Sequence, residues 1–239
     1  MAIESIKALV FDVFGSVVDW RGSIIEEGRK LGREKGILID WESFADQWRG
    51  KYQPSLERVR CGERSWTRLD DLHLESLVEL LEQFGIEHLS EVEIENFNRV
   101  WHRLRPWPDV VAGLGRLKER FIIGTLSNGN ISLLVNMAKR AGLPWDVILG
   151  AEPARAYKPL PSSYLLTCEF LGLPPSEVML VAAHNDDLLH ARHHGMGTAF
   201  VARPTEYGPR QSKDLRAEHS YDITALNFLD LADQLGTTN

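Results

Sequence analysis

The chain has 239 residues, of which 44% are hydrophobic and 26% charged, proportions typical of a soluble globular protein with an ample buried core. Its formal net charge is -7 and its basic residues are scattered. This argues against nucleic acid or an anionic membrane as the main partner, although a local basic pocket could still bind a small anion. Cys61 and Cys168 form no CxxC pair, so no metal or redox motif is present, and we expect two reduced thiols in a cytoplasmic protein.

The sequence begins MAIESIKALVFDVFG, in which no basic segment precedes a long apolar run. Asp12 interrupts the short apolar stretch. The pattern predicts a buried strand rather than a signal peptide or a membrane span.

Short apolar runs alternate with helical patterns along most of the chain. The predicted strands are 6–13, 121–126, 147–149, 178–183 and 198–202, and the predicted helices are 109–119, 130–142, 162–172, 187–195 and 223–235. This alternation predicts an α/β protein with a Rossmann-like parallel sheet and helices on both faces.

About 100 residues separate the first two predicted strands, and nearly all of them have helical periodicity. The helical patterns cover 23–35, 41–51, 67–84 and 91–104. Because strand-to-helix connections are normally a few residues long, this stretch is better interpreted as an inserted helical cap over the sheet. Two prolines in the segment 105–108 would stop the last cap helix. The sequence therefore predicts a core of residues 1–19 and 106–239 and a cap of residues 20–105.

Polar residues follow four of the predicted strands at the edge where open α/β sheets bind ligands. Asp12 follows the first strand, where it could be a nucleophile or a turn cap. Ser127 and Asn128 follow the second, where they could cap a helix or hold an anion.

Lys158 follows the third strand and precedes a proline, with Tyr164 six residues later. It could be a surface lysine, but beside Asp12 it would keep the aspartate ionised. His184 and Asp187 follow the fourth strand, where a turn with a helix cap is the structural alternative. Each signal is weak alone, and their order along successive strands makes the combination stronger.

These four motifs resemble those of the haloacid dehalogenase superfamily, whose first subclass carries a helical cap after the first strand. The resemblance covers nearly the whole chain. The phosphatase branch of that superfamily has a second Asp in its first motif, as a proton donor, and an acidic residue in its fourth motif, which helps to hold magnesium. Here these positions are Phe14 and Ala183, so both the acid and part of the metal site are missing.

The sequence is more similar to the type II (L-2-haloacid) dehalogenases, whose first motif is Asp-x-Tyr-Gly-Thr. This chain has Asp12-Val13-Phe14-Gly15-Ser16, and it keeps Leu-Ser-Asn-Gly at 126–129, Tyr-Lys-Pro at 157–159 and a Trp-Arg pair at 48–49. It departs from the Ser-Ser-Asn that often follows the fourth strand, since Ala182-Ala183-His184 stands there. This leaves the halogen preference and the water-activating residue open.

The resemblance implies hydrolysis of short 2-haloalkanoic acids to 2-hydroxy acids through an ester on Asp12, without metal or cofactor. It implies catalytic roles for Asp12, Ser127, Lys158, His184 and Asp187, and substrate contacts from Phe14, Ser16, Arg49, Asn128, Tyr164 and Trp66. His184 could be a hydrogen-bond partner, a halide contact, a base or merely structural. The resemblance also implies a small-molecule haloacid as partner and a possible homodimer. The alternatives are a magnesium-dependent phosphatase or phosphonatase and a non-catalytic protein that binds a small acid.

Overall fold

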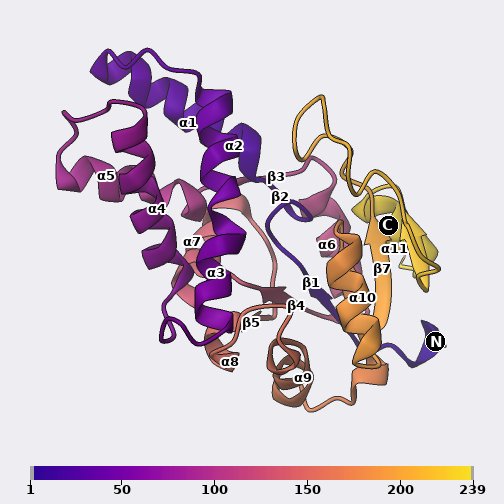
Figure 1. The fold of residues 1–239 in the computed structure, drawn as a ribbon. Helices are drawn as coiled ribbons and strands as arrows, with labels where there is room; N and C mark the ends of the chain where they lie inside the picture. Colours follow the sequence, from indigo (N-terminus) through magenta and orange to yellow (C-terminus); the bar gives the residue numbers. More distant parts are fainter. Residues whose placement is uncertain (1–2, 238–239) are drawn as a thin grey trace.

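The computed structural model describes residues 3–237, so residues 1–2 and 238–239 of the predicted core lie outside the described part. A six-stranded parallel sheet forms its centre, in the order β5-β4-β1-β6-β7-β8 (Figure 1). The strands are β1 (Ala8–Phe11), β4 (Ile122–Ser127), β5 (Val147–Gly150), β6 (Val178–Ala182), β7 (Gly197–Val201) and β8 (Ile223–Ala225). The predicted α/β class with a Rossmann-like parallel sheet is confirmed.

Residues of β1 alternate between two buried faces, as a strand covered on both sides requires. Ala8 and Val10 belong to the apolar cluster of α9 (Pro161–Phe170) and α10 (Asn185–His193). Leu9 and Phe11 belong to the larger cluster on the opposite face. The helices of that face are α6 (Val110–Lys118), α7 (Ile131–Ala141) and α11 (Phe228–Gln234), and the short α8 (Ala151–Ala154) follows β5.

The segment between the short strands β2 and β3 is helical, and it lies to one side of the large sheet (Figure 1). Its elements are α1 (Trp20–Lys35), α2 (Trp41–Gly50), α3 (Tyr52–Arg60), α4 (Leu69–Gln83), α5 (Glu91–Asn98) and a 3-10 turn (Arg99–His102). Two short strands, β2 (Val18–Asp19) and β3 (Arg105–Pro106), pair antiparallel where the chain leaves and rejoins the sheet region. We call residues 20–105 the inserted helices.

Two predicted elements were wrong. The predicted helix 41–51 was followed by no further helix before residue 67, but α3 forms there. Its Pro54 lies in the first turn, where a missing N–H breaks no intrahelical hydrogen bond. The predicted helix 223–235 begins instead as strand β8, which pairs with β7 before α11 starts. Among the helices of residues 3–237, none is long and apolar enough to span a bilayer.

Candidate active site

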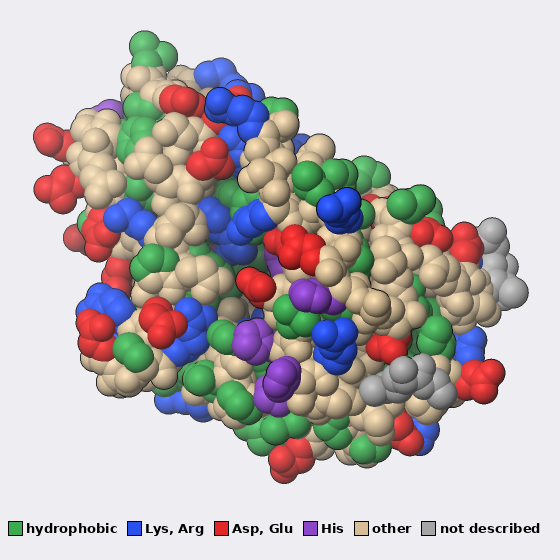
Figure 2. Space-filling view, turned by 45° about the vertical axis from the view of Figure 1, so that its right-hand side comes forward, with side chains coloured by type: hydrophobic (Ala, Val, Ile, Leu, Met, Phe, Trp, Pro, Cys, Tyr) green, Lys and Arg blue, Asp and Glu red, His purple; other side chains and the backbone are tan. Residues whose placement is uncertain are grey.

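Asp12 lies at the carboxyl end of β1, between the ends of β4 and β6. This is the point where the strand order changes direction, and open α/β sheets bind ligands at such points. The side chain faces a cavity of about 640 Å³ between the sheet and the inserted helices. Acidic, basic and histidine side chains gather around this hollow (Figure 2).

The Asp12 carboxylate is buried, since only 7% of the residue is exposed. Three donors from the protein hold it in place of water. The Lys158 ammonium lies 3.0 Å from Oδ1, while His184 Nδ1 and Ser16 Oγ lie 3.0 and 2.7 Å from Oδ2. Burial by itself would raise the pKa of Asp12, but the Lys158 and His184 charges and these hydrogen bonds hold it far below its usual range. Asp12 is therefore an ionised carboxylate.

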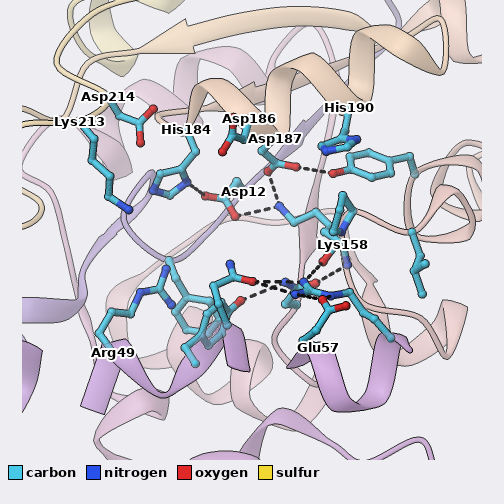
Figure 3. Close-up of a pocket in the computed structure, with 18 of the residues that line it drawn as sticks. Asp12, Arg49, Glu57, Lys158, His184, Asp186, Asp187, His190, Lys213 and Asp214 are labelled. Atoms are coloured by element: carbon cyan, nitrogen blue, oxygen red, sulfur yellow. Dashed lines mark hydrogen bonds and ion pairs between the residues drawn. The ribbon is translucent and has the colours of Figure 1, made fainter. Parts of the chain in front are cut away.

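Lys158 bridges two carboxylates (Figure 3), because its ammonium also pairs with Asp187. Tyr164 completes the chain, since its hydroxyl donates to Asp187 Oδ1 at 2.8 Å. Burial alone would lower the pKa of Lys158, but the two carboxylates raise it above its usual value. The sequence-predicted Lys158, Tyr164 and Asp187 thus form one buried network with Asp12.

His184 stands between two carboxylates. Its Nδ1 faces Asp12, and its Nε2 lies 2.9 and 3.1 Å from the two oxygens of Glu206, which the sequence analysis did not single out. Burial by itself would lower the pKa of His184, but Glu206 and Asp12 raise it well above its ordinary value. With Asp12 ionised, His184 is an imidazolium.

Ser127 and Asn128, the predicted pair at the end of β4, differ in position, because only Asn128 lines the cavity. Asn128 lines the cavity, accepts the backbone N–H of Lys158 at 2.8 Å and donates to the hydroxyl of Tyr52 at 3.0 Å. Ser127 is fully buried and its hydroxyl accepts the N–H of Gly129. Ser16 is likewise buried behind Asp12 and also accepts the N–H of Ala183. The structure places neither serine on the cavity wall.

The inserted helices place Arg49 across the cavity from Asp12 (Figure 3). Its guanidinium stacks on Tyr52, 4.1 Å from the ring centroid, and its buried Nη1 has no hydrogen-bond partner in the described part of the chain. Phe14 also lines the cavity and packs edge-on against Trp101 at 5.8 Å. A guanidinium with an unpaired nitrogen beside an apolar wall suits a small anion with an apolar substituent.

Trp66 was predicted as a wall of the halogen pocket, but the structure places it elsewhere. Its ring stacks on Tyr157 at a centroid distance of 4.8 Å, and the Arg155 guanidinium lies over it at 5.4 Å. It is absent from the cavity wall. Packing against Tyr157 accounts for its position, so we correct this assignment.

The sequence analysis also missed functional neighbours on α3. Tyr52 holds Asn128, and Arg60 donates to the backbone oxygen of Lys158 at 2.8 Å. Glu206 lies just beyond the fifth predicted strand, so the inspection of strand ends applied to the other four strands could have found it. Across residues 3–237, no group of three or more His, Cys, Asp or Glu side chains is placed to hold a metal ion.

The fold and the site define a Rossmann-like α/β protein with a buried, ionised carboxylate at the carboxyl end of β1. The model of the haloacid dehalogenase-like hydrolase family matches residues 6–195. The chain belongs to this family.

Solved structures agree with this membership. The chain is 48% identical to a crystal structure of an L-2-haloacid dehalogenase, with a TM-score of 0.94 and coverage of 98% of this chain and 100% of that one. It is also 48% identical to a defluorinating L-2-haloacid dehalogenase, with a TM-score of 0.95 and coverage of 96% and 95%. The L-2-haloacid dehalogenase from Xanthobacter autotrophicus, solved with chloropropionic acid covalently bound, is 26% identical, with a TM-score of 0.80 and coverage of 98% and 100%.

Proposed function

We propose that this protein hydrolyses short-chain 2-haloalkanoic acids, such as haloacetates and L-2-halopropionates, to 2-hydroxy acids. The observation that carries the proposal is that an ionised, buried Asp12 faces the Arg49 guanidinium across one cavity, and Nη1 of this guanidinium has no hydrogen-bond partner among the described residues. Its relatives at 48% identity are L-2-haloacid dehalogenases.

In the first step, Asp12 attacks C2 of the substrate from the face opposite the halogen. The carbon–halogen bond breaks, the halide leaves with the bonding electrons, C2 is inverted, and an ester on Asp12 remains. Arg49 and Asn128 contact the departing halide, and Phe14 forms part of the apolar wall around it. The covalently bound chloropropionic acid in the Xanthobacter relative supports a covalent intermediate.

In the second step, water attacks the ester carbonyl carbon and releases the 2-hydroxy acid. Lys158 stabilises the developing oxyanion from its position beside Oδ1, and Asp187 and Tyr164 hold Lys158. Ser16 holds Asp12 in place. Ser127, through the backbone at the end of β4, is proposed to support the substrate carboxylate.

Two positions argue for attack on carbon rather than phosphorus. Phe14 is an apolar cavity wall, and Ala183 offers only a backbone N–H, which donates to Ser16. A halide leaves without a general acid, and a carboxylate with one negative charge is matched by one guanidinium. We therefore propose a reaction that needs neither metal nor cofactor.

A halide-release panel tests this function. The enzyme, treated with EDTA, is incubated with fluoro-, chloro- and bromoacetate and with L-2-chloropropionate. Fluoroacetate is included because one relative is defluorinating. We expect halide release that survives EDTA, and no release from any of these acids would overturn the proposal. Magnesium-dependent release of phosphate from small phosphate esters would favour the phosphatase alternative, whereas tight haloacid binding without turnover would favour a binding protein.

Asp12→Asn is the sharpest single variant for this function. Removing the carboxylate charge leaves no nucleophile, so we expect a loss of more than about 10⁴-fold in kcat. One turnover of the native enzyme in heavy-oxygen water should place the label in Asp12, which mass spectrometry of its peptide would detect. Label in the product alone would contradict an ester intermediate.

We also propose that residues 20–105 act as a cap that closes over the substrate and excludes water. Tyr52 and Arg60 support this, since both bond to residues at the ends of core strands or their loops. We also predict a cytoplasmic location, with which the free thiols of Cys61 and Cys168 are compatible. A homodimer is a further prediction. Light scattering in solution tests the dimer.

A further inference from the structure

The ring of His184 joins two buried carboxylates that come from distant parts of the chain. Nδ1 lies 3.0 Å from Asp12 Oδ2, and Nε2 lies 2.9 Å from Glu206 Oε2. Asp12 follows β1, whereas Glu206 lies in the loop after β7. The imidazole therefore has one nitrogen toward the reacting carboxylate and the other toward a second, unreacting one.

The Glu206 carboxylate is held in place by its surroundings. The residue is 1% exposed, and its Oε1 accepts the indole N–H of Trp20 at 3.0 Å. It fills the space where a side chain at Gly15 would stand, because a Cβ there would lie 2.2 Å from Oε1. Gly15 also has a φ of +92°, which favours glycine. A buried charge held this closely calls for a partner, and that partner is His184.

Alkylation of Asp12 changes the charge on only one side of this ring. In the resting enzyme Asp12 and Glu206 are both anionic, and their charges keep the pKa of His184 well above its ordinary value. An ester on Asp12 is neutral, so one of the two carboxylates that favour the imidazolium disappears. The proton on Nδ1 then has no anionic acceptor, whereas the proton on Nε2 still has the Glu206 carboxylate as its acceptor.

We propose that Glu206 is a positioning residue that fixes His184 as the general base for hydrolysis of the Asp12 ester. The inference rests on the function proposed above and assigns its water-activating residue. His184 would touch the attacking water, and Glu206 would act through His184 by holding its Nε2 proton and the orientation of its ring.

The step balances in atoms and protons. Formation of the ester releases the halide, and the Nδ1 proton passes to solvent through the open cavity. Water then gives a proton to Nδ1 while its oxygen bonds to Cγ of Asp12, and Lys158 stabilises the charge on Oδ1. The Cγ–Oδ2 bond breaks, and Oδ2 leaves with the substrate carbon, taking the Nδ1 proton to become the product hydroxyl. The acid proton left on Asp12 returns to His184, which restores the starting charges.

Glu206→Gln separates the two chemical steps. Glutamine keeps the shape and can still accept from Trp20, but it has no charge to hold the imidazole. With L-2-chloropropionate, we expect a burst of one chloride per active site at nearly the native rate, followed by turnover about 10²-fold to 10⁴-fold slower. The ester should accumulate, and mass spectrometry of the quenched protein would show it on the Asp12 peptide.

A pH profile distinguishes positioning from a merely structural role. His184 contacts Asp12 and Glu206 directly. The other charged groups that line the same cavity near it are Arg49, Lys158, Asp186, Asp187, Lys213 and Asp214. Ester hydrolysis in the native enzyme should rise with pH as His184 loses its proton. Because removal of the Glu206 charge lowers the pKa of His184, the rise should move to lower pH in Glu206→Gln. Glu206→Asp should restore part of the rate.

Glu218→Gln is the matched control, since Glu218 is an exposed glutamate of the same loop, and it should keep native kinetics. Should Glu206→Gln fail to fold, His184→Asn gives the same test, and it must also accumulate ester. Equal slowing of burst and turnover in the folded variant, or turnover with an unchanged pH profile, would overturn the inference. Absence of halide release by the native enzyme would instead overturn the proposed function.

Discussion

The two sides of the cavity differ in how their charges are satisfied. On the sheet side, Asp12, Lys158, Asp187, His184 and Glu206 are joined by direct hydrogen bonds or ion pairs. On the side of the inserted helices, the Arg49 guanidinium rests on Tyr52, and its Nη1 has no partner among the described residues.

This difference suggests a division of labour. A network that is complete before substrate arrives needs no rearrangement to support charge in the transition state. A buried guanidinium nitrogen without a hydrogen-bond partner is unfavourable until an anion reaches it. We infer that the sheet side carries the chemistry and the inserted helices carry recognition.

The largest effect that tests this division is expected for Lys158→Met. Without the ammonium, Asp12 and Asp187 lose their shared counter-charge, and the oxyanion at Oδ1 loses its donor. We expect kcat to fall by about 10²-fold to 10³-fold. The pKa of Asp12 should rise toward its usual range, so the activity that remains should fail at a higher pH on acidification than in the native enzyme.

Lys51→Met is the control, because Lys51 is a lysine of the inserted helices that pairs with the exposed Glu79. Steady-state halide release across pH measures both variants. Native kcat in Lys158→Met would contradict a chemical role for the sheet-side network.

Arg49→Met tests the other side. It keeps an apolar stem against Tyr52 but removes the free cation. Since a hydrogen bond to a charged group contributes about 1.5–3 kcal/mol, we expect KM to rise roughly ten-fold to a hundred-fold. The melting temperature should stay constant or increase, because a buried nitrogen without a hydrogen-bond partner is lost.

Arg58→Met serves for comparison, since Arg58 pairs with Glu63 at the surface. A clear drop in the melting temperature of Arg49→Met, with KM unchanged, would show that Arg49 is structural and would break the division between the two sides.

The sequence predicted the sheet side better than the inserted helices, for a physical reason. Parallel strands bring their carboxyl ends together, so Asp12, Lys158 and Asp187 could be placed near one another from strand order alone. Positions on the inserted helices depend on how helices pack, which short-range periodicity does not specify. Trp66 therefore was placed wrongly, and α3 with its contacts to Asn128 and Lys158 was missed.

Glu206 escaped detection for a different reason. It lies in an irregular loop, and its partner His184 is 22 residues earlier in the chain. No periodicity connects the two, and only the closeness of β6 and β7 in the sheet brings their following loops together. The departure at His184 was visible in the sequence, and inspection of the fifth strand's end would have raised Glu206 as a candidate, but the contact between the two depends on the fold.

A smaller effect is expected on stability at high pH. The folded-state pKa of His184 is raised, so its ion pairs contribute stability that is fully present below its unfolded value of about 6.5. That stability is lost as pH rises through the folded value. The melting temperature of His184→Asn should therefore lie further below that of the native protein at about pH 6 than at about pH 9.5. A gap that does not depend on pH would contradict the doubly paired imidazolium.

The smallest effect is expected for Trp66→Leu, which tests the corrected boundary of the site. Trp66 packs on Tyr157 outside the cavity wall, and Tyr157 donates to the backbone oxygen of Thr67 at 2.7 Å. Loss of the stacked pair should cost about 0.5–1.5 kcal/mol of unfolding free energy, while kcat and KM for L-2-chloropropionate stay native. Denaturant unfolding and halide release measure the two quantities separately. A change in halogen preference without loss of stability would return Trp66 to the pocket, and recognition would then extend further across the inserted helices than Arg49 indicates.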